Sequence, residues 1–179
     1  FEAADFDTWA TSTAFESDEA IYSQYFDFQI RPKEKIFTTF GARRDSHTTA
    51  GDFTTYRFTS AYKPNSSTKF RNSIGTGIRF ATLNDYFYDT NVIRKENLKP
   101  EKSFSIDLGV EKKLLQEKLV IDTTLFHMEY DDTISGWQSH KSSGSGWTIE
   151  NSSGEVKSTG FELSASLITE VIDKIMFGY

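Results

Sequence analysis

Regular alternation of apolar and polar residues over one strand–turn–strand unit constrains the fold of this chain more than any other feature. The unit runs from Asn97 to Trp137. Its first half alternates apolar with polar residues in the order Phe104, Ser105, Ile106, Asp107, Leu108, Gly109, Val110 and Glu111. After the turn Gln116–Lys118, the run 119–125 alternates in the same way. Because successive residues of a strand point to opposite faces, the sequence predicts a β-hairpin with one apolar face and one polar face.

The same alternation recurs along the chain, in the runs 36–45, 56–62, 70–80 and 159–167. In each run the aromatic residues keep to the apolar face, while charges and glycines gather on the polar face. The charged residues expected on the polar face are Arg43, Asp45, Arg57, Arg71, Arg79, Asp107, Glu111, Asp122 and Glu162. The pattern predicts an all-β, antiparallel up-and-down sheet of about eight strands.

Composition narrows the setting in which such a sheet is stable. Aromatic residues make up 15% of the chain, although the mean hydropathy is −0.50. No run approaches the roughly 18 apolar residues of a membrane helix, and no segment shows the near-continuous apolar run of a strand buried in a soluble core. A transmembrane β-barrel needs only alternation, an aromatic outer band and a polar interior. A soluble antiparallel sheet alternates in the same way, so the periodicity alone leaves both folds open.

The lengths of the connections favour the membrane barrel. Short turns are expected at Arg31–Glu34, Pro64–Ser67 and Gln116–Lys118, and long polar connections at 46–52, 81–97 and 133–155. Residues 1–15 also read as a loop. Short and long connections alternate, so tight turns gather at one end of the sheet and long loops at the other. Outer-membrane barrels have this arrangement of periplasmic turns and extracellular loops.

Several segments resemble the β-barrel of TonB-dependent outer-membrane receptors, with order and spacing kept. NLKPEKSFSIDLGVEKKL (97–114), LFHMEYDDTI (125–134) and STGFELSAS (158–166) are similar to consecutive strands of that family. The earlier stretches FGARRDSHTTAGDFTTYRFTSAY (40–62) and RNSIGTGIRFATLNDYF (71–87) resemble its preceding strands. Within the family, His47–Thr49, Thr55–Arg57 and Leu98–Lys102 look most like the cobalamin receptor group.

The resemblance implies a 22-stranded barrel whose lumen is filled by an N-terminal plug domain carrying the segment that engages TonB. Residues 1–179 have room for about eight strands, so we expect them to be a partial barrel domain, without the plug and the remaining strands. An open sheet has two unpaired edges, which are costly in lipid. The expected partners are therefore outer-membrane lipid, the missing strands, the plug domain, TonB through the absent N-terminal region, and a chelate ligand. The expected location is the outer membrane of a Gram-negative bacterium.

In a barrel the polar face lines the lumen. Charges at membrane depth are expensive unless they face a wet cavity and find partners. We therefore expect the nine charged residues named above to pair with one another and with the plug. The alternative is that they are simply solvated lumen charges. Gly75 and Gly77 lie on the same face and would allow close approach of the plug or bending of the strand.

Two clusters in the long connections are candidates for ligand capture. One comprises Tyr86, Phe87, Tyr88 and Asp89 with Arg94, and the other comprises Trp137, His140 and Trp147. Aromatic and charged side chains of this kind are expected to bind a large ligand such as a corrinoid or an iron chelate. The alternative is an interfacial aromatic belt, which any membrane barrel has.

No cofactor or metal centre is expected. Asp131 and Asp132, or Asp85 with Asp89, could supply oxygen ligands to calcium, but their spacing is not that of a known calcium loop and solvation explains them as well. Thiolate sites are excluded because the chain has no cysteine. The net charge of −6 argues against a nucleic-acid partner.

The sequence gives little support for an enzymatic function. The three histidines, His47, His127 and His140, form no ligand pair, and no nucleophile or dinucleotide motif is present. The first hypothesis is therefore an outer-membrane receptor for TonB-energised uptake of a scarce large ligand of the cobalamin or iron-siderophore type. The second is a soluble or surface β-sheet binding module, such as a carbohydrate-binding or adhesin domain. A passive porin is a third.

Overall fold

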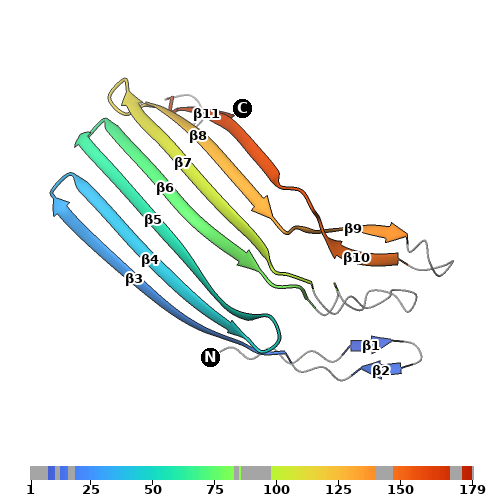
Figure 1. The fold of residues 1–179 in the computed structure, drawn as a ribbon. Coiled ribbons are helices and arrows are strands. Elements are labelled where there is room, and N and C mark those ends of the chain that lie inside the picture. The colour runs from blue at the N-terminus through green and yellow to red at the C-terminus, as the bar shows by residue number, and fades with distance from the viewer. Residues whose placement is uncertain are drawn as a thin grey trace.

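The fold is a single eight-stranded antiparallel sheet with two small hairpins attached to one end (Figure 1). A computed structural model of the chain describes residues 8–10, 13–15, 19–82, 85, 98–139, 147–169 and 175–178. The strands of the sheet are β3 (Ile21–Lys33), β4 (Ile36–His47), β5 (Gly51–Asn65), β6 (Thr68–Arg79), β7 (Glu101–Leu114), β8 (Leu119–Asp131), β11 (Val156–Leu167) and β12 (Ile175–Gly178). They lie side by side in chain order, which confirms the predicted all-β up-and-down architecture.

Two hairpins occupy segments that the sequence analysis assigned to loops. Strand β1 (Thr8–Ala10) pairs with β2 (Thr13–Phe15), and β9 (Ile134–Ser139) pairs with β10 (Trp147–Asn151). The β9–β10 hairpin is inserted between β8 and β11 and extends away from the end of the sheet (Figure 1). The prediction of loop was wrong for these residues, because strands of three to six residues are too short to show a clear alternation.

Tight turns connect the strands at the opposite end of the sheet, as predicted. Their residues are Glu34–Lys35, Ser66–Ser67 and Leu115–Lys118. The first two begin later than expected, because β3 and β5 continue through the prolines into the turns. In the third turn Leu115, Gln116 and Glu117 all have positive φ, at 51°, 55° and 68°.

The connection between β4 and β5 is the clearest departure from expectation. We expected a polar loop over 46–52, but the strands extend to His47 and from Gly51, and only Thr48–Ala50 join them. The reason is a side chain: the buried His47 ring accepts hydrogen bonds at Nδ1 from the backbone N–H groups of Thr49 and Ala50, both at 3.2 Å. Short and long connections therefore do not alternate strictly.

The register of the sheet separates two faces. Rows of paired residues such as Phe28, Phe40, Phe58, Ile74 and Ile106 cross from β3 to β7 on one side. This apolar face is open: Leu108 is 53% exposed and Phe161 is 58% exposed. Among the described residues few apolar side chains are buried, namely Ala81, Leu98 and Pro100. The apolar residues thus form an outer surface, and the sheet has no conventional core.

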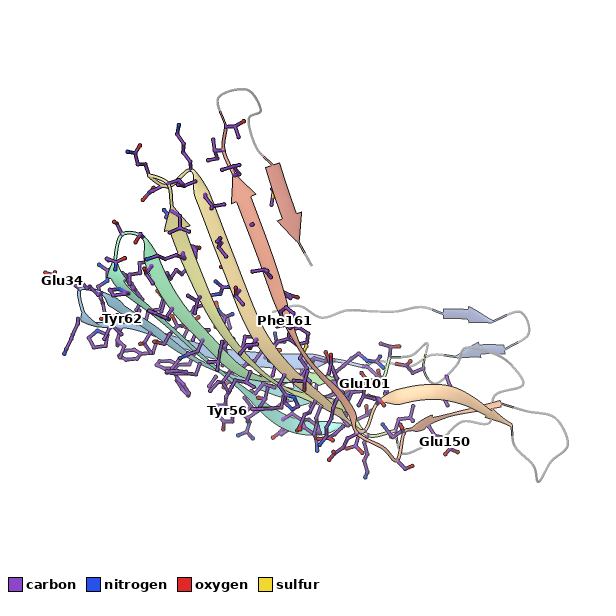
Figure 2. All side chains as sticks on the ribbon, turned by 90° about the horizontal axis from the view of Figure 1, so that it is seen from above. Glu34, Tyr56, Tyr62, Glu101, Glu150 and Phe161 are labelled. Atoms are coloured by element: carbon purple, nitrogen blue, oxygen red, sulfur yellow. The ribbon has the colours of Figure 1, made fainter. Side chains whose placement is uncertain are left out.

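The described sheet is an open wall rather than a closed barrel. Strands β3 and β12 are its two edges, and in the part of the chain that the structure describes they do not pair with each other. Seen from above, the strands follow a curved path from β3 to β11 (Figure 2). Among the described residues, no helix has the length and apolar character needed to cross a membrane.

Candidate functional site: the polar face and the loop end

The structure brings all nine charged residues of the predicted polar face onto one side of the sheet. Cross-strand partners in an antiparallel ladder share a face. Arg79 pairs with Glu101, Glu111 with Asp122, and Asp107 with Ser73 in such rows. The same rule places the remaining members on this face through the registers of β4 to β11. We refer to this side as the polar face, and to the end with the β9–β10 hairpin as the loop end.

The first ion-pair cluster lies near the tight turns and connects three strands. Arg71 on β6 extends across Gly109 on β7 and reaches β8, where its Nη2 donates to Asp122 Oδ1 and to Thr124 Oγ1, both at 2.6 Å. A Cβ atom on Gly109 would lie 2.6 Å from the Arg71 guanidinium carbon. Glycine at this position therefore leaves free the space that the Arg71 side chain occupies on its way to Asp122.

The second cluster lies toward the loop end on β3 and β4. The Arg43 Nε donates to Asp45 Oδ1 at 2.8 Å, and the Ser23 hydroxyl also donates to that oxygen. The Asp45 side chain is 5% exposed, and these donors compensate for its burial.

A third cluster joins the sheet to the β9–β10 hairpin. Arg79 donates from Nε and Nη2 to the two oxygens of Glu101, at 2.6 and 2.8 Å, and from Nη1 to Asp85 at 3.1 Å. Glu101 Oε1 also accepts the backbone N–H of Ile134, the first residue of β9, at 2.7 Å. The carboxylate therefore fixes the start of the hairpin to the ends of β6 and β7 (Figure 2).

Asn151 fixes the other strand of the hairpin. Its Oδ1 accepts the backbone N–H of Lys99, and its Nδ2 donates to the carbonyl oxygens of Lys99 and Asp132, at 2.6 to 2.8 Å. All three groups lie close to the point where the hairpin leaves the sheet. The sequence analysis missed Asn151, since one asparagine in a Gly/Ser-rich segment carries no local signal of a contact that spans 52 positions.

A small aromatic cluster closes the loop end of β4, β5 and β6. The His47 ring lies 4.6 Å from the Phe80 ring, and Phe53 meets Phe80 edge-on at 5.5 Å. His47 Nε2 lies 4.0 Å from Glu19. The sequence analysis found no role for this histidine, and the structure gives it a structural one.

The side chains of four of the nine charged residues make no ion pair or hydrogen bond among the described residues. They are Arg57, Asp107, Glu111 and Glu162. Glu111 and Asp107 still contribute a favourable field at Arg71. Pairing within the wall thus accounts for part of the predicted network, and Arg57 is the arginine that the wall leaves without a partner.

Of the predicted ligand-capture residues, the structure describes Trp137 and Trp147. Tyr86, Phe87, Tyr88, Asp89, Arg94 and His140 lie outside the described residues. Trp137 and Trp147 lie on β9 and β10, where Trp137 pairs with Ile149 and Trp147 pairs with Ser139. This register puts both tryptophan positions on the same face of the hairpin.

Calcium ligation stays a prediction. Asp85 Oδ2 accepts the backbone N–H and the hydroxyl of Thr82, at 2.8 and 2.9 Å, in addition to Arg79. Asp132 lies 3.9 Å from the Lys99 ammonium. Among the described residues, no group of three or more acidic or histidine side chains could hold a metal ion.

Comparison with known proteins identifies the family. The family model described as TonB dependent receptor-like, beta-barrel matches residues 2–173. The chain belongs to the TonB-dependent receptor family. As a member of this family it is an outer-membrane protein of Gram-negative bacteria, and its sheet matches part of the family's barrel. The chain is 30% identical over 131 residues to the vitamin B12 transporter BtuB of Vibrio vulnificus (strain YJ016). That match covers 73% of this chain and 20% of the transporter.

Solved structures share the fold. The siderophore receptor PirA from Pseudomonas aeruginosa superposes with a TM-score of 0.73 at 17% identity, over 90% of this chain and 35% of that structure. PirA from Acinetobacter baumannii gives 0.67 at 17% identity, over 83% of this chain and 26% of that structure. A mutant ferric enterobactin receptor, PfeA, from Pseudomonas aeruginosa, in complex with enterobactin, gives 0.70 at 20% identity, over 84% of this chain and 25% of that structure. This chain therefore spans about a fifth of the length of the B12 transporter and at most about a third of the length of the solved structures.

Proposed function

We propose that this chain is part of the barrel wall of an outer-membrane receptor that takes up a scarce large ligand by TonB-energised transport. The observation that carries the proposal is the difference between the two faces of the sheet. Large apolar residues are exposed on one face, and three ion-pair clusters lie on the other. In water such an apolar surface would be an aggregation liability, whereas in a bilayer it is the surface that lipid requires.

The proposal assigns a partner to each surface. Outer-membrane lipid contacts the apolar face, and the polar face lines a lumen that a plug domain fills. Further strands of a 22-stranded barrel complete the hydrogen bonding of edges β3 and β12, because unpaired backbone groups in lipid cost several kcal/mol each. TonB engages a segment outside these residues.

The ligand binds at the loop end. The two tryptophan positions on one face of the β9–β10 hairpin support this proposal, since aromatic rings on a fixed hairpin offer a large stacking surface at small entropic cost. Tyr86, Tyr88, Asp89 and Arg94 belong to the neighbouring connection and are proposed to contribute to the same site. A cobalamin or an iron siderophore is the expected ligand class, because these are what the relatives named above transport or bind by their names.

Uptake by the full-length receptor tests the function. Cells expressing it should accumulate labelled cyanocobalamin or a labelled ferric siderophore, only when TonB is present, and the protein should fractionate with outer membranes. Replacement of Trp137 and Trp147 by alanine should lower the affinity for the ligand by at least about tenfold, as expected when stacking on two rings is lost. The replacement Gln138→Ala, on the opposite face of the same hairpin, is the matched control.

Two results would contradict the proposal. A monodisperse protein in plain buffer would favour a soluble binding module. Uptake that is independent of TonB and shows no saturation would favour a passive porin.

A further inference from the structure

Arg57 differs from the other arginines of the polar face in having no partner. Arg43, Arg71 and Arg79 each form an ion pair with a carboxylate of the wall. Arg57 is exposed, and within the described residues its side chain makes no ion pair or hydrogen bond. A lumenal guanidinium without a counter-charge is costly at membrane depth unless something else supplies one.

Glycines flank Arg57 in both neighbouring strands. In the sheet register Gly41 of β4 and Gly75 of β6 lie directly beside it, and Asp27 of β3 and Ser105 of β7 continue the row. The backbone on either side of the guanidinium therefore carries no side chain.

These two glycines are uncovered, unlike Gly77, Gly109 and Gly160 on the same face. A Cβ on Gly109, Gly160 or Gly77 would lie 2.6 or 2.7 Å from side-chain atoms of Arg71, Phe126 or Ser103. At Gly41 and Gly75 the nearest atoms are 3.6 to 3.9 Å away and are backbone atoms, the Arg57 Cβ or the Ser105 hydroxyl. Nothing in the wall requires glycine at these two positions. Glycine inside a strand often marks a place where another backbone approaches closely.

The surrounding charges favour an anion. Of the charged groups near this row, Arg43 on β4 and Arg71 on β6 are cationic but already paired. Two carboxylates lie two strands away: Asp27 is separated from Arg57 by the width of β4, and Asp107, two residues beyond Ser105 on β7, is separated from it by the width of β6. Arg71 closes such a gap to Asp122 by lying over Gly109, whereas the surroundings of Gly41 and Gly75 show that the Arg57 guanidinium lies over neither glycine. Arg57 therefore extends toward neither carboxylate.

We propose that Arg57, Gly41 and Gly75 form a docking socket for an aspartate or glutamate carboxylate on the polypeptide that fills the lumen. This inference rests on the proposed plug-filled barrel and names the residue that holds the plug. The guanidinium binds the carboxylate through two parallel N–H···O bonds. The bare glycines let the partner backbone approach the wall without a steric clash.

Channel recording on the full-length receptor in planar bilayers tests the socket. Urea that just begins to unseat the plug opens the lumen, and the frequency of open-channel events reports how firmly the plug is held. Arg57→Gln should raise that frequency at least about tenfold, the factor expected when one charge-assisted contact is lost, while Arg57→Lys should recover only part of the loss. Arg44→Gln is the matched control, because Arg44 lies on the next strand, faces outward and pairs with Asp52.

Three further variants control for misfolding and for a partner within the wall. Gly75→Ser should also raise the event frequency, because its side chain fills the socket while meeting only ordinary contacts in the wall. Asp27→Asn and Asp107→Asn should each leave the event frequency unchanged. If either aspartate variant reproduces Arg57→Gln, the arginine pairs within the wall and the socket is overturned; equal behaviour of wild type, Arg57→Gln and Gly75→Ser overturns it too. A lumen already open without urea would instead contradict the proposed function.

Discussion

Arg71 on β6 and Asp122 on β8 form an ion pair across the full width of β7, with Arg71 Nη2 and Asp122 Oδ1 2.6 Å apart. Two strand spacings, about 9.6 Å, separate their backbones. The pair exists because the intervening position is Gly109, whose missing side chain leaves a channel for the guanidinium. It joins three strands of a wall that has almost no buried core, so lateral ties of this kind take over part of the role of packing.

Gly109→Ala should therefore destabilise the barrel by about 1–2 kcal/mol, in the lower part of the range for a charge-assisted hydrogen bond because both side chains keep some solvent contact. The added Cβ would displace Arg71 from Asp122. Denaturant unfolding of the receptor in lipid vesicles measures the change. Gly154→Ala is the control, since its nearest neighbour would be 4.0 Å away. Equal stability of the two variants would show that Arg71 has another route to its partner.

The orientation of the sheet predicts opposite responses at two adjacent positions of β5. Phe58 projects from the apolar face, and Thr59 from the polar face. Phe58→Arg should cost about 2–4 kcal/mol, the penalty for arginine near the middle of a bilayer, while Thr59→Arg should be nearly neutral. Unfolding in vesicles and the fraction of protein recovered in outer membranes both measure this difference. The assignment of faces would fail if the two substitutions cost the same.

Periodicity predicted the sheet because the side chains of a strand alternate whatever the partner is. For the same reason it placed all nine charged residues on the correct face, from Arg43 to Glu162. Connection lengths were less informative. The turn at Thr48–Ala50 depends on a buried His47 ring that accepts two backbone N–H groups, and no local pattern distinguishes that histidine from one in a loop.

The ion pairs and hydrogen bonds between side chains of different strands were harder to predict than the face on which each side chain lies. In sequence, Arg57 and Arg71 have similar surroundings, since each follows an aromatic residue and precedes a small hydroxyl residue, Thr59 or Ser73, by two positions. The Arg71 side chain pairs with Asp122 two strands away, whereas the Arg57 side chain has no partner among the described residues. The difference depends on register and side-chain direction, which single-sequence alternation does not encode. The anchoring of β9 and β10 by Glu101 and Asn151 was missed for the same reason.

Asn72 is a polar exception on the apolar face, and its replacement should stabilise the barrel. Its Oδ1 is buried and has no hydrogen-bond partner among the described residues. It lies in a groove of about 340 Å³, and the other principal lining residues are Ser60, Tyr62, Phe70, Leu108, Val110 and Leu125. Asn72→Leu removes an unsatisfied acceptor and fills apolar space, so we expect a gain of about 1–2 kcal/mol in unfolding free energy.

The control for Asn72→Leu is Asn72→Asp, which keeps the shape and adds a charge on the lipid side. It should destabilise the protein in vesicles of the same composition. A loss of stability in Asn72→Leu would mean that the amide has a partner in the assembled barrel.

The hairpin at the loop end provides the last prediction, because its attachment depends on a few polar contacts. Asn151 makes three hydrogen bonds that fix β10 to Lys99 and Asp132. Asn151→Ala breaks all three and leaves the Lys99 N–H without its acceptor, so the base of the hairpin should open more often while the sheet stays folded. Limited proteolysis should cut residues 132–155 at least about tenfold faster, as loss of one to two kcal/mol of local stability implies, and the amides of β9 should exchange faster with solvent. Ser153→Ala, at an exposed position next to the same strand, should change neither rate. If ligand affinity falls in parallel with the loss of amide protection, the fixed hairpin contributes preorganisation to binding; unchanged protection in Asn151→Ala would show that Glu101 alone holds the hairpin in place.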